Sequence, residues 1–185
     1  MGTGITTRIL GLDPGTLRLG FGLVASNGTA AELATSGVLT APAAWEPSRR
    51  LGHLAAELTA LLDRERPDCI ALEASFFGKN AHSLIRLGEA RGMVLALAGG
   101  RGLAVHDYPP ATVKKSVVGH GGASKEQVAR MVAALFPGLG ARRLEQSLDQ
   151  TDAIAIAWCH VHQQRLAERR SAIGLALEKE RRVGR

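Results

Sequence analysis

The sequence predicts an α/β domain in which a mixed five-stranded sheet is flanked by helices. Two observations support this fold class. Three apolar, strand-like runs joined by short turns come first, and helical and strand-like segments alternate after them. Consecutive strands joined by short turns form an antiparallel meander, whereas strands separated by a helix pair in parallel. The sheet is therefore expected to be antiparallel in its first half and parallel in its second.

The first three strands are expected at residues 8–13, 20–25 and 31–40. The first two are the apolar runs RILGLD and GFGLVA, and the third, AELATSGVLT, alternates loosely between apolar and polar residues. A Ser-Asn-Gly tripeptide at 26–28 separates the second run from the third. Because Asn and Gly tolerate positive φ angles, this tripeptide predicts a tight turn.

A helix is expected at residues 48–65, where leucines recur at the spacing of one helical face and Pro67 ends the pattern. The later elements are expected as strands at 68–74 and 103–108 and as helices at 80–98, 112–118, 124–136 and 149–169. Residues 1–168 are expected to form a single domain. Residues 169–185 are expected to form a basic, flexible C-terminal tail, because they lack turn residues and a clear apolar face.

Length and composition fit one globular domain with a polyanionic partner. The 185 residues include 45% hydrophobic residues, enough to fill a core, and the formal net charge is +6. Residues 165–185 carry seven Lys or Arg against three Asp or Glu, a net of +4. The tail therefore accounts for most of the positive surplus, and the rest of the chain is nearly neutral.

Several classes of protein are excluded or disfavoured. No apolar run reaches the roughly 18 residues that a membrane span needs, and no signal peptide is visible. The two cysteines, Cys69 and Cys159, fit small core positions in a reducing cytosol, so a cytoplasmic location is expected. Motifs of serine hydrolases, zincins and P-loop NTPases are absent, and the six histidines show no metal-ligand spacing. An auxiliary role near the site stays open for His82 and His120.

Four acidic residues do not fit the default of a solvated surface charge. Asp13 ends the first apolar strand, and Glu73 lies near the end of another. Asp149 and Asp152 open an otherwise apolar helix, where their i, i+3 spacing puts them on one face. Asp13 alone could be a turn residue, and Asp149 alone could be a favourable charge at a helix N-terminus. An acid inside an apolar strand, however, costs stability unless something offsets its charge.

A divalent cation is the natural offset for acids that converge at one edge of a sheet. Carboxylate oxygens and water suit Mg²⁺ or Mn²⁺. Two such ions roughly 4 Å apart can activate a water and stabilise the leaving oxygen in phosphodiester hydrolysis. The four acids therefore predict a site for two Mg²⁺ ions, with Mn²⁺ as a substitute.

Four segments resemble RuvC-type Holliday-junction resolvases, the crossover junction endodeoxyribonucleases. ILGLDPGTLRLGFG is similar to their first strand and hairpin, and ALEASFFGKNAHSLIRLGEARG to their second acidic strand with its loop and helix. YPPATVKKSVVGHGGASKEQV resembles their basic DNA-contacting segment, and LDQTDAIAIAWCH resembles the helix with the last two acids. These motifs occur in family order and spacing from residue 8 to about residue 162.

The resemblance implies an RNase H-like nuclease domain at 1–168 that works as a homodimer. Such enzymes resolve four-way DNA junctions by paired symmetric nicks in recombination and repair, together with the RuvA–RuvB branch-migration complex. By family position, the metal-binding catalytic acids are Asp13, Glu73, Asp149 and Asp152.

The resemblance also assigns DNA contacts. Phe76 matches the aromatic residue that inserts at the junction centre, and its neighbour Phe77 is the alternative. Stacking on a base contributes roughly 1–3 kcal/mol. Lys114 and Lys125 match basic residues that contact DNA, where lysines give a salt-dependent affinity. Further candidates for DNA contact are Lys79, Arg86, Lys115, Arg142 and Arg143.

A homodimer also suits the approximate two-fold symmetry of a four-way junction. The helix expected at 80–98 has small residues next to larger apolar ones, so it could pack closely against its symmetry mate. The alternative is that this face simply packs on the sheet. The residues concerned are Leu84, Leu87, Ala90, Gly92, Met93 and Ala96.

Three other functions stay open. A nuclease of the same fold could act on RNA or RNA–DNA hybrids, although the aromatic loop and the basic segment argue against it. An actin-like or sugar-kinase-like ATPase also has a strand followed by an Asp-x-Gly turn, but it needs two duplicated domains. A DNA-binding module without catalysis fits poorly, because four convergent acids would repel phosphate.

Overall fold

A mixed five-stranded sheet with strand order β3-β2-β1-β4-β5 forms the centre of the molecule. The computed structural model describes residues 5–74, 81–137 and 147–183. The strands are β1 (Thr7–Asp13), β2 (Arg18–Ser26), β3 (Ala31–Thr40), β4 (Cys69–Glu73) and β5 (Ala104–Tyr108). The first three strands pair antiparallel, whereas β4 runs parallel to β1 and β5 runs parallel to β4. The predicted mixed sheet is confirmed.

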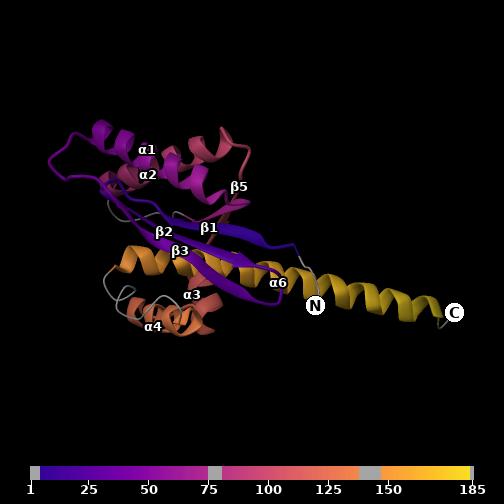
Figure 1. The fold of residues 1–185 in the computed structure, drawn as a ribbon. Coiled ribbons are helices and arrows are strands. Elements are labelled where there is room, and N and C mark those ends of the chain that lie inside the picture. Colours follow the sequence, from indigo (N-terminus) through magenta and orange to yellow (C-terminus); the bar gives the residue numbers. More distant parts are fainter. Residues whose placement is uncertain (1–4, 75–80, 138–146, 184–185) are drawn as a thin grey trace.

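Helices cover both faces of this sheet (Figure 1). α1 (Pro47–Glu65) and α2 (Ala81–Gly99) lie together over one face, and α6 (Leu148–Val183) runs along the other. α3 (Pro110–Val118) and α4 (Lys125–Leu135) pack against α6 on the side away from the sheet. The layers are therefore a helix pair, the sheet, α6, and a second helix pair.

Alternate residues of the central strands fill two separate cores, because successive side chains of a strand point to opposite faces. Leu10 and Leu12 of β1 join the core under α1 and α2, with Leu54 of α1. Ile9 joins the core between the sheet and α6, with Ile154 of α6. All five of these side chains are fully buried, so the N-terminal part of α6, up to Val161, is as much a part of the interior as the strands are.

Glycines on β1 and β2 allow α6 to lie directly on the sheet. A Cβ atom on Gly11 would collide with the carbonyl oxygen of Ala153, and one on Gly22 would collide with Ile154. A Cβ atom on Gly20 would collide with the carbonyl oxygen of Asp149. The sequence of the first hairpin therefore fixes the height and position of the N-terminal half of α6.

The expected elements agree with the structure to within about two residues, with one exception. Ser124 and Gln127 form a capping box at the start of α4. The exception is the tail: α6 does not end near Arg169 but continues as helix to Val183. The physical reason is that residues 170–183 contain no Pro and are rich in Ala, Leu, Glu, Lys and Arg. Such residues extend an existing helix without a new nucleation step.

The division into a domain at 1–168 and a flexible tail stays a prediction, although its boundary falls inside a helix.

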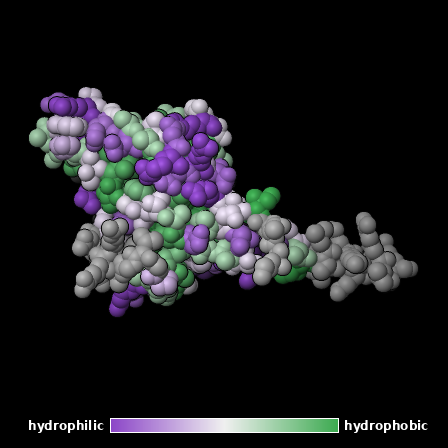
Figure 2. Space-filling model, viewed as in Figure 1, coloured by the Kyte–Doolittle hydropathy of each residue, from purple (hydrophilic) through white to green (hydrophobic). Residues whose placement is uncertain are grey.

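On the face shown in Figure 2, strongly hydrophilic residues gather where α1, α2 and β5 lie, and hydrophobic residues form separate patches. Within the described parts of the chain, no helix has the length and apolar character of a membrane span.

Candidate active site

Two parallel strands bring the first two acids to one edge of the sheet. Asp13 is the last residue of β1 and Glu73 is the last residue of β4. The two strands are neighbours, with Leu12 paired to Leu72. Because parallel strands end at the same edge, both carboxylates lie at the carboxyl end of the sheet centre.

The start of α6 carries the other two acids to the same edge, and several contacts fix it there. The side-chain oxygen of Ser147 accepts a hydrogen bond from the backbone N–H of Gln150. The Gln150 amide donates in turn to the hydroxyl of Ser36 on β3 at 2.8 Å. The side chains of Asp149 and Asp152 therefore extend from the first turns of α6, where these hydrogen bonds fix the backbone.

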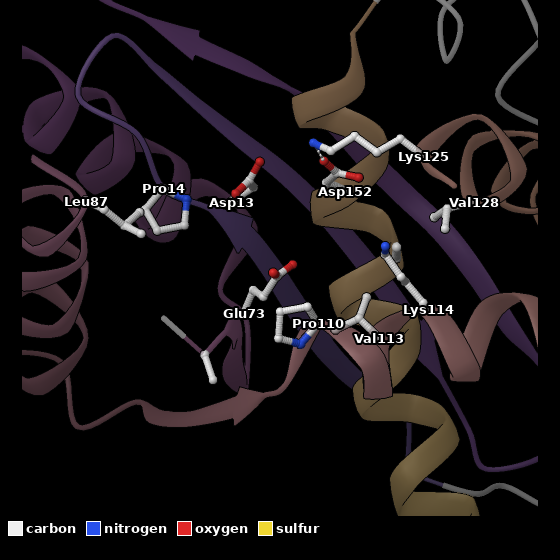
Figure 3. Close-up of a pocket in the computed structure, with 12 residues that line it drawn as sticks. Asp13, Pro14, Glu73, Leu87, Pro110, Val113, Lys114, Lys125, Val128 and Asp152 are labelled. Carbon is white, nitrogen blue, oxygen red and sulfur yellow. Dashed lines mark hydrogen bonds and ion pairs between the residues drawn. The ribbon is translucent and has the colours of Figure 1, made fainter. Parts of the chain in front are cut away.

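Three of the four acids line a cavity of about 430 Å³. The carboxylates of Asp13, Glu73 and Asp152 point toward one another in Figure 3. Lys114 of α3 and Lys125 of α4 lie across the cavity from Asp13 and Glu73, with Lys125 beside Asp152. The remaining lining is mostly apolar and consists of Pro14, Ala74, Leu87, Pro110, Val113, Val128 and Ala155.

Asp149 lies beside this cavity rather than in its lining. Its carboxylate accepts a hydrogen bond from the Arg18 guanidinium, which also donates to Ser147. It is nevertheless close enough to repel the Asp13 carboxylate. The four acids thus form one electrostatic group, in which, among the residues that the structure describes, only Asp149 has an arginine partner.

The pKa values show how strongly these acids need a cation. Burial and, after it, repulsion from the three other acids raise the pKa of Asp13 to about 7. Burial and then repulsion from Asp152 raise the pKa of Glu73. Both shifts mean that negative charge is unfavourable here without an added positive charge.

Lysine supplies part of that positive charge. The Lys125 ammonium lies 2.9 Å from a carboxylate oxygen of Asp152, and this hydrogen bond raises the pKa of Lys125. Among the described residues, neither Asp13 nor Glu73 has a cationic side chain within ion-pair distance. Two half-buried carboxylates without an ion-pair partner there are the donor set that Mg²⁺ or Mn²⁺ prefers.

The acids do not yet form a closed ligand shell. The only described group of metal-ligating side chains with all its ligand atoms within 4.8 Å of one another lies elsewhere in the molecule. The wider spacing of the acids is what mutual repulsion between carboxylates produces. A bound divalent ion would replace this repulsion by attraction.

The other predicted site residues are placed only in part. Lys114 and Lys125 reach the cavity. Arg86, Lys115 and His120 are exposed and do not line it. The predicted contacts that lie outside the described residues are Phe76, Phe77, Lys79, Arg142 and Arg143, and nothing is described of the His82 side chain.

Sequence reasoning missed two arginines at this site. Arg18 opens β2 and holds Asp149, as described above. Arg91 of α2 donates two hydrogen bonds to the carboxylate of Asp107, at 2.6 and 2.7 Å, and a third to the backbone carbonyl of Glu73. The available signal was Arg91 at the start of the apolar second half of α2, where a half-buried cation needs an anionic partner.

The fold and the acid cluster together define the class of protein: an RNase H-like nuclease domain. A sequence profile of the family "Crossover junction endodeoxyribonuclease RuvC" matches residues 9–160. The chain therefore belongs to the RuvC family of crossover junction endodeoxyribonucleases.

Individual relatives agree with this assignment. The RuvC protein of Syntrophomonas wolfei is 39% identical over 160 residues, covering 86% of this chain and 91% of the relative. The RuvC protein of Maricaulis maris is 41% identical over 168 residues, covering 91% of this chain and 98% of the relative.

Solved structures show the same fold. Thermus thermophilus RuvC in complex with a Holliday junction substrate has a TM-score of 0.78 and 33% identity, covering 87% of this chain and 96% of that one. The yeast mitochondrial Holliday junction resolvase Ydc2 has a TM-score of 0.65 at 15% identity, covering 91% of this chain and 84% of that one, and thus shares the fold.

Proposed function

We propose that this protein resolves four-way DNA junctions by Mg²⁺-dependent hydrolysis of phosphodiester bonds, with two ions per active site. The observation that carries the proposal is the cluster of Asp13, Glu73, Asp149 and Asp152 beside an open, lysine-lined cavity. The relatives named above support the substrate, since one of them is solved with a Holliday junction. Cleavage of this substrate gives the protein a role in DNA recombination and repair.

The four acids would hold the ions, which supply charge for an attacking water and for the leaving oxygen. The chain's own contribution is to fix the ligands in place. Asp13 and Glu73 are held by the sheet, and Asp149 and Asp152 by the anchored start of α6. Arg18 orients Asp149, so this acid cannot turn away into solvent.

The two lysines have different roles in this proposal. Lys125 pairs with Asp152 in this structure, and with the acids holding ions its side chain would be available to a DNA phosphate. Lys114 lines the cavity without an ion pair among the described residues, so it is free to hold the backbone beside the scissile bond. Phe76, with Phe77 as the alternative, is proposed to stack at the junction centre on the strength of the family resemblance alone.

A homodimer is proposed through α2. Ala90, Val94 and Ala98 of this helix are fully buried within the chain. The sequence suggested that Ala90 could contact a symmetry mate, but its burial makes it unavailable for that contact. Ile85 and Leu95 are 60% and 41% exposed, and they offer an apolar face to a second copy. The RuvA–RuvB complex as a partner and the cytoplasmic location stay predictions.

Substrate choice tests the proposed function directly. The purified protein is incubated with a synthetic four-way junction, a linear duplex and an RNA–DNA hybrid, each with Mg²⁺ or Mn²⁺. We expect paired nicks in the junction and little cleavage of the other two substrates. Preferred cleavage of the hybrid would instead support the alternative nuclease, and failure to cut any of them with either ion would contradict the proposal.

A further inference from the structure

A second group of metal-ligating side chains lies on the α6 side of the sheet, away from the acids. Cys69 of β4, His106 of β5 and His160 of α6 each offer one ligand atom, and these three atoms lie within 4.8 Å of one another. Cys69 begins β4 and Glu73 ends it. At about 3.3 Å per residue, roughly 13 Å of strand separates the two sites.

The sheet register creates this group from residues far apart in the sequence. Cys69 pairs with Ala104 and Ala71 pairs with His106, so Cys69 and His106 stand on one face of adjacent strands. α6 covers that face and brings His160 against both. Each ligand therefore comes from a different element of the fold.

The geometry of two ligands already matches a tetrahedral zinc site. The Cys69 sulfur lies 3.6 Å from Nε2 of His160. With zinc bonds of about 2.3 Å to sulfur and about 2.0–2.1 Å to nitrogen, a tetrahedral angle places these two atoms about 3.6 Å apart. A thiol-to-imidazole hydrogen bond explains this single distance, but it does not explain why a second imidazole, His106, also approaches.

Tyr108 holds His160 in the orientation that a ligand needs. The Tyr108 hydroxyl lies 2.6 Å from Nδ1 of His160, which leaves Nε2 directed at Cys69. Metal-binding histidines commonly use their second nitrogen in this way, to fix the ring and its tautomer.

Access and chemistry favour a thiophilic ion over Mg²⁺. Cys69 and His160 are buried, at 6% and 2% exposed, whereas His106 is exposed on the edge strand and provides an entry path. Only an ion that binds thiolate strongly can displace the thiol proton of Cys69, which leaves to the solvent as the metal–sulfur bond forms.

We propose that Cys69, His106 and His160 bind one Zn²⁺ ion, with the fourth position open to water on the exposed side of His106. The ion would join β4, β5 and α6 and stabilise the folded chain. This site is independent of the acids, because its ligands are sulfur and nitrogen, and it does not depend on the proposed function.

Cobalt(II) serves as the spectroscopic probe for the site. The full-length protein, reduced and freed of metal, is titrated with Co²⁺ in the presence of excess Mg²⁺. We expect a sulfur-to-cobalt charge-transfer band and tetrahedral d–d bands that saturate at one ion per chain, and Zn²⁺ should abolish them. Absence of the charge-transfer band would overturn the proposal.

Matched variants separate this cluster from the other buried thiol. Cys69→Ser should lose the charge-transfer band, whereas Cys159→Ser should keep it, because the Cys159 thiol interacts with Ser116 instead. A band that persists in Cys69→Ser, or that disappears only in Cys159→Ser, would contradict the assignment. Circular dichroism confirms that both variants are folded.

Two further variants test the remaining groups without removing the buried cysteine. His106→Ala changes an exposed position and should weaken Co²⁺ binding by at least roughly tenfold, and Tyr108→Phe by roughly 10- to 100-fold. Zn²⁺ should also raise the melting temperature of the wild type but not that of His106→Ala. Unchanged affinity and an unchanged zinc effect in His106→Ala would exclude it as a ligand and overturn the three-residue site.

Discussion

At the scale of single residues, Asp13 shows how the site is prepared for a cation. It combines burial with repulsion from three other acids, and its pKa is therefore raised to about 7. Asp149 forms an ion pair with Arg18, and Asp152 forms one with Lys125. Asp13 has no such partner among the described residues, so it is the residue on which metal binding and stability should depend most.

The Asp13 carboxyl should make the metal-free protein less stable as pH rises from about 4 to about 7. In this interval Asp13 keeps its proton in the folded chain but loses it in the unfolded chain, so its contribution to stability falls. The buried His160 imidazole, whose pKa is lowered to about 4, contributes in the opposite direction, so the effect of Asp13 is read as the difference between variants. That difference is at most about 4 kcal/mol. Relative to Asp13→Asn, the wild type should lose stability across this interval in thermal unfolding with a chelator, and Glu57→Gln, an exposed acid on α1, should follow the wild type. Parallel profiles for the wild type and Asp13→Asn would contradict the assignment.

The lysines of α3 offer a comparison between neighbours. Lys114 lines the acid cavity, whereas Lys115 is exposed outside it. We expect Lys114→Ala to lower the rate at saturating junction by roughly tenfold or more, since a group that positions the reacting phosphate is lost. Lys115→Ala should change only the affinity and its salt dependence. Single-turnover cleavage and salt-dependent binding separate the two effects, and equal rate losses in both variants would remove the special role of Lys114.

At the scale of elements, the contact between the first hairpin and α6 positions half of the site. The glycines of β1 and β2 let the α6 backbone touch the sheet, and this contact sets the positions of Asp149 and Asp152. A glycine inside a strand normally weakens it, so these positions indicate close approach of another backbone.

Replacing Gly11 tests this contact. Gly11→Ala should destabilise the fold by roughly 1–3 kcal/mol or more, because its Cβ would meet the backbone of α6. Gly52 on α1 is the control: it lies in a helix with open space around its Cα, so Gly52→Ala should stabilise by about 0.5–1 kcal/mol. Denaturant unfolding measures both, and a neutral Gly11→Ala would show that α6 is not fixed this way.

Most helices and strands and the four acids could be predicted from the sequence, because each of them corresponds to a local sequence pattern. Apolar runs, helical spacing and Pro or Gly at the ends located the strands and helices, and an acid at the end of an apolar strand is visible in the sequence. The Cys69, His106 and His160 group leaves no such pattern, since only the register of β4 and β5 and the packing of α6 bring it together. The length of α6 was missed because residues 170–183 lack an apolar face, although their helix propensity was high.

At the scale of the whole molecule, one chain presents one active site to a substrate with two equivalent strands to cut. The large apolar residues that α2 leaves exposed are Ile85 and Leu95. Arg91 of the same helix contacts the backbone of Glu73, so a dimer built on α2 would connect the interface to the active-site strand. The end of α6 extends away from the body (Figure 1), on the far side from the acids.

The dimer proposal predicts a specific loss of assembly. Ile85→Glu should convert the protein to a monomer, because it puts a charge into an apolar interface. Ile173→Glu is the control, since Ile173 is an isoleucine of equal exposure, 61%, on α6. Sedimentation velocity reports the assembly state, and a dimer that survives Ile85→Glu would exclude this face of α2.

The most direct test of the account asks whether Asp13 is needed for cleavage but not for binding. Wild type and Asp13→Asn are compared on one synthetic four-way junction, with binding measured in a chelator and nicking measured after addition of Mg²⁺. We predict that both proteins bind the junction, and that only the wild type makes the paired symmetric nicks. Cleavage by Asp13→Asn at the wild-type rate would contradict the central claim that the acid cluster holds the catalytic ions.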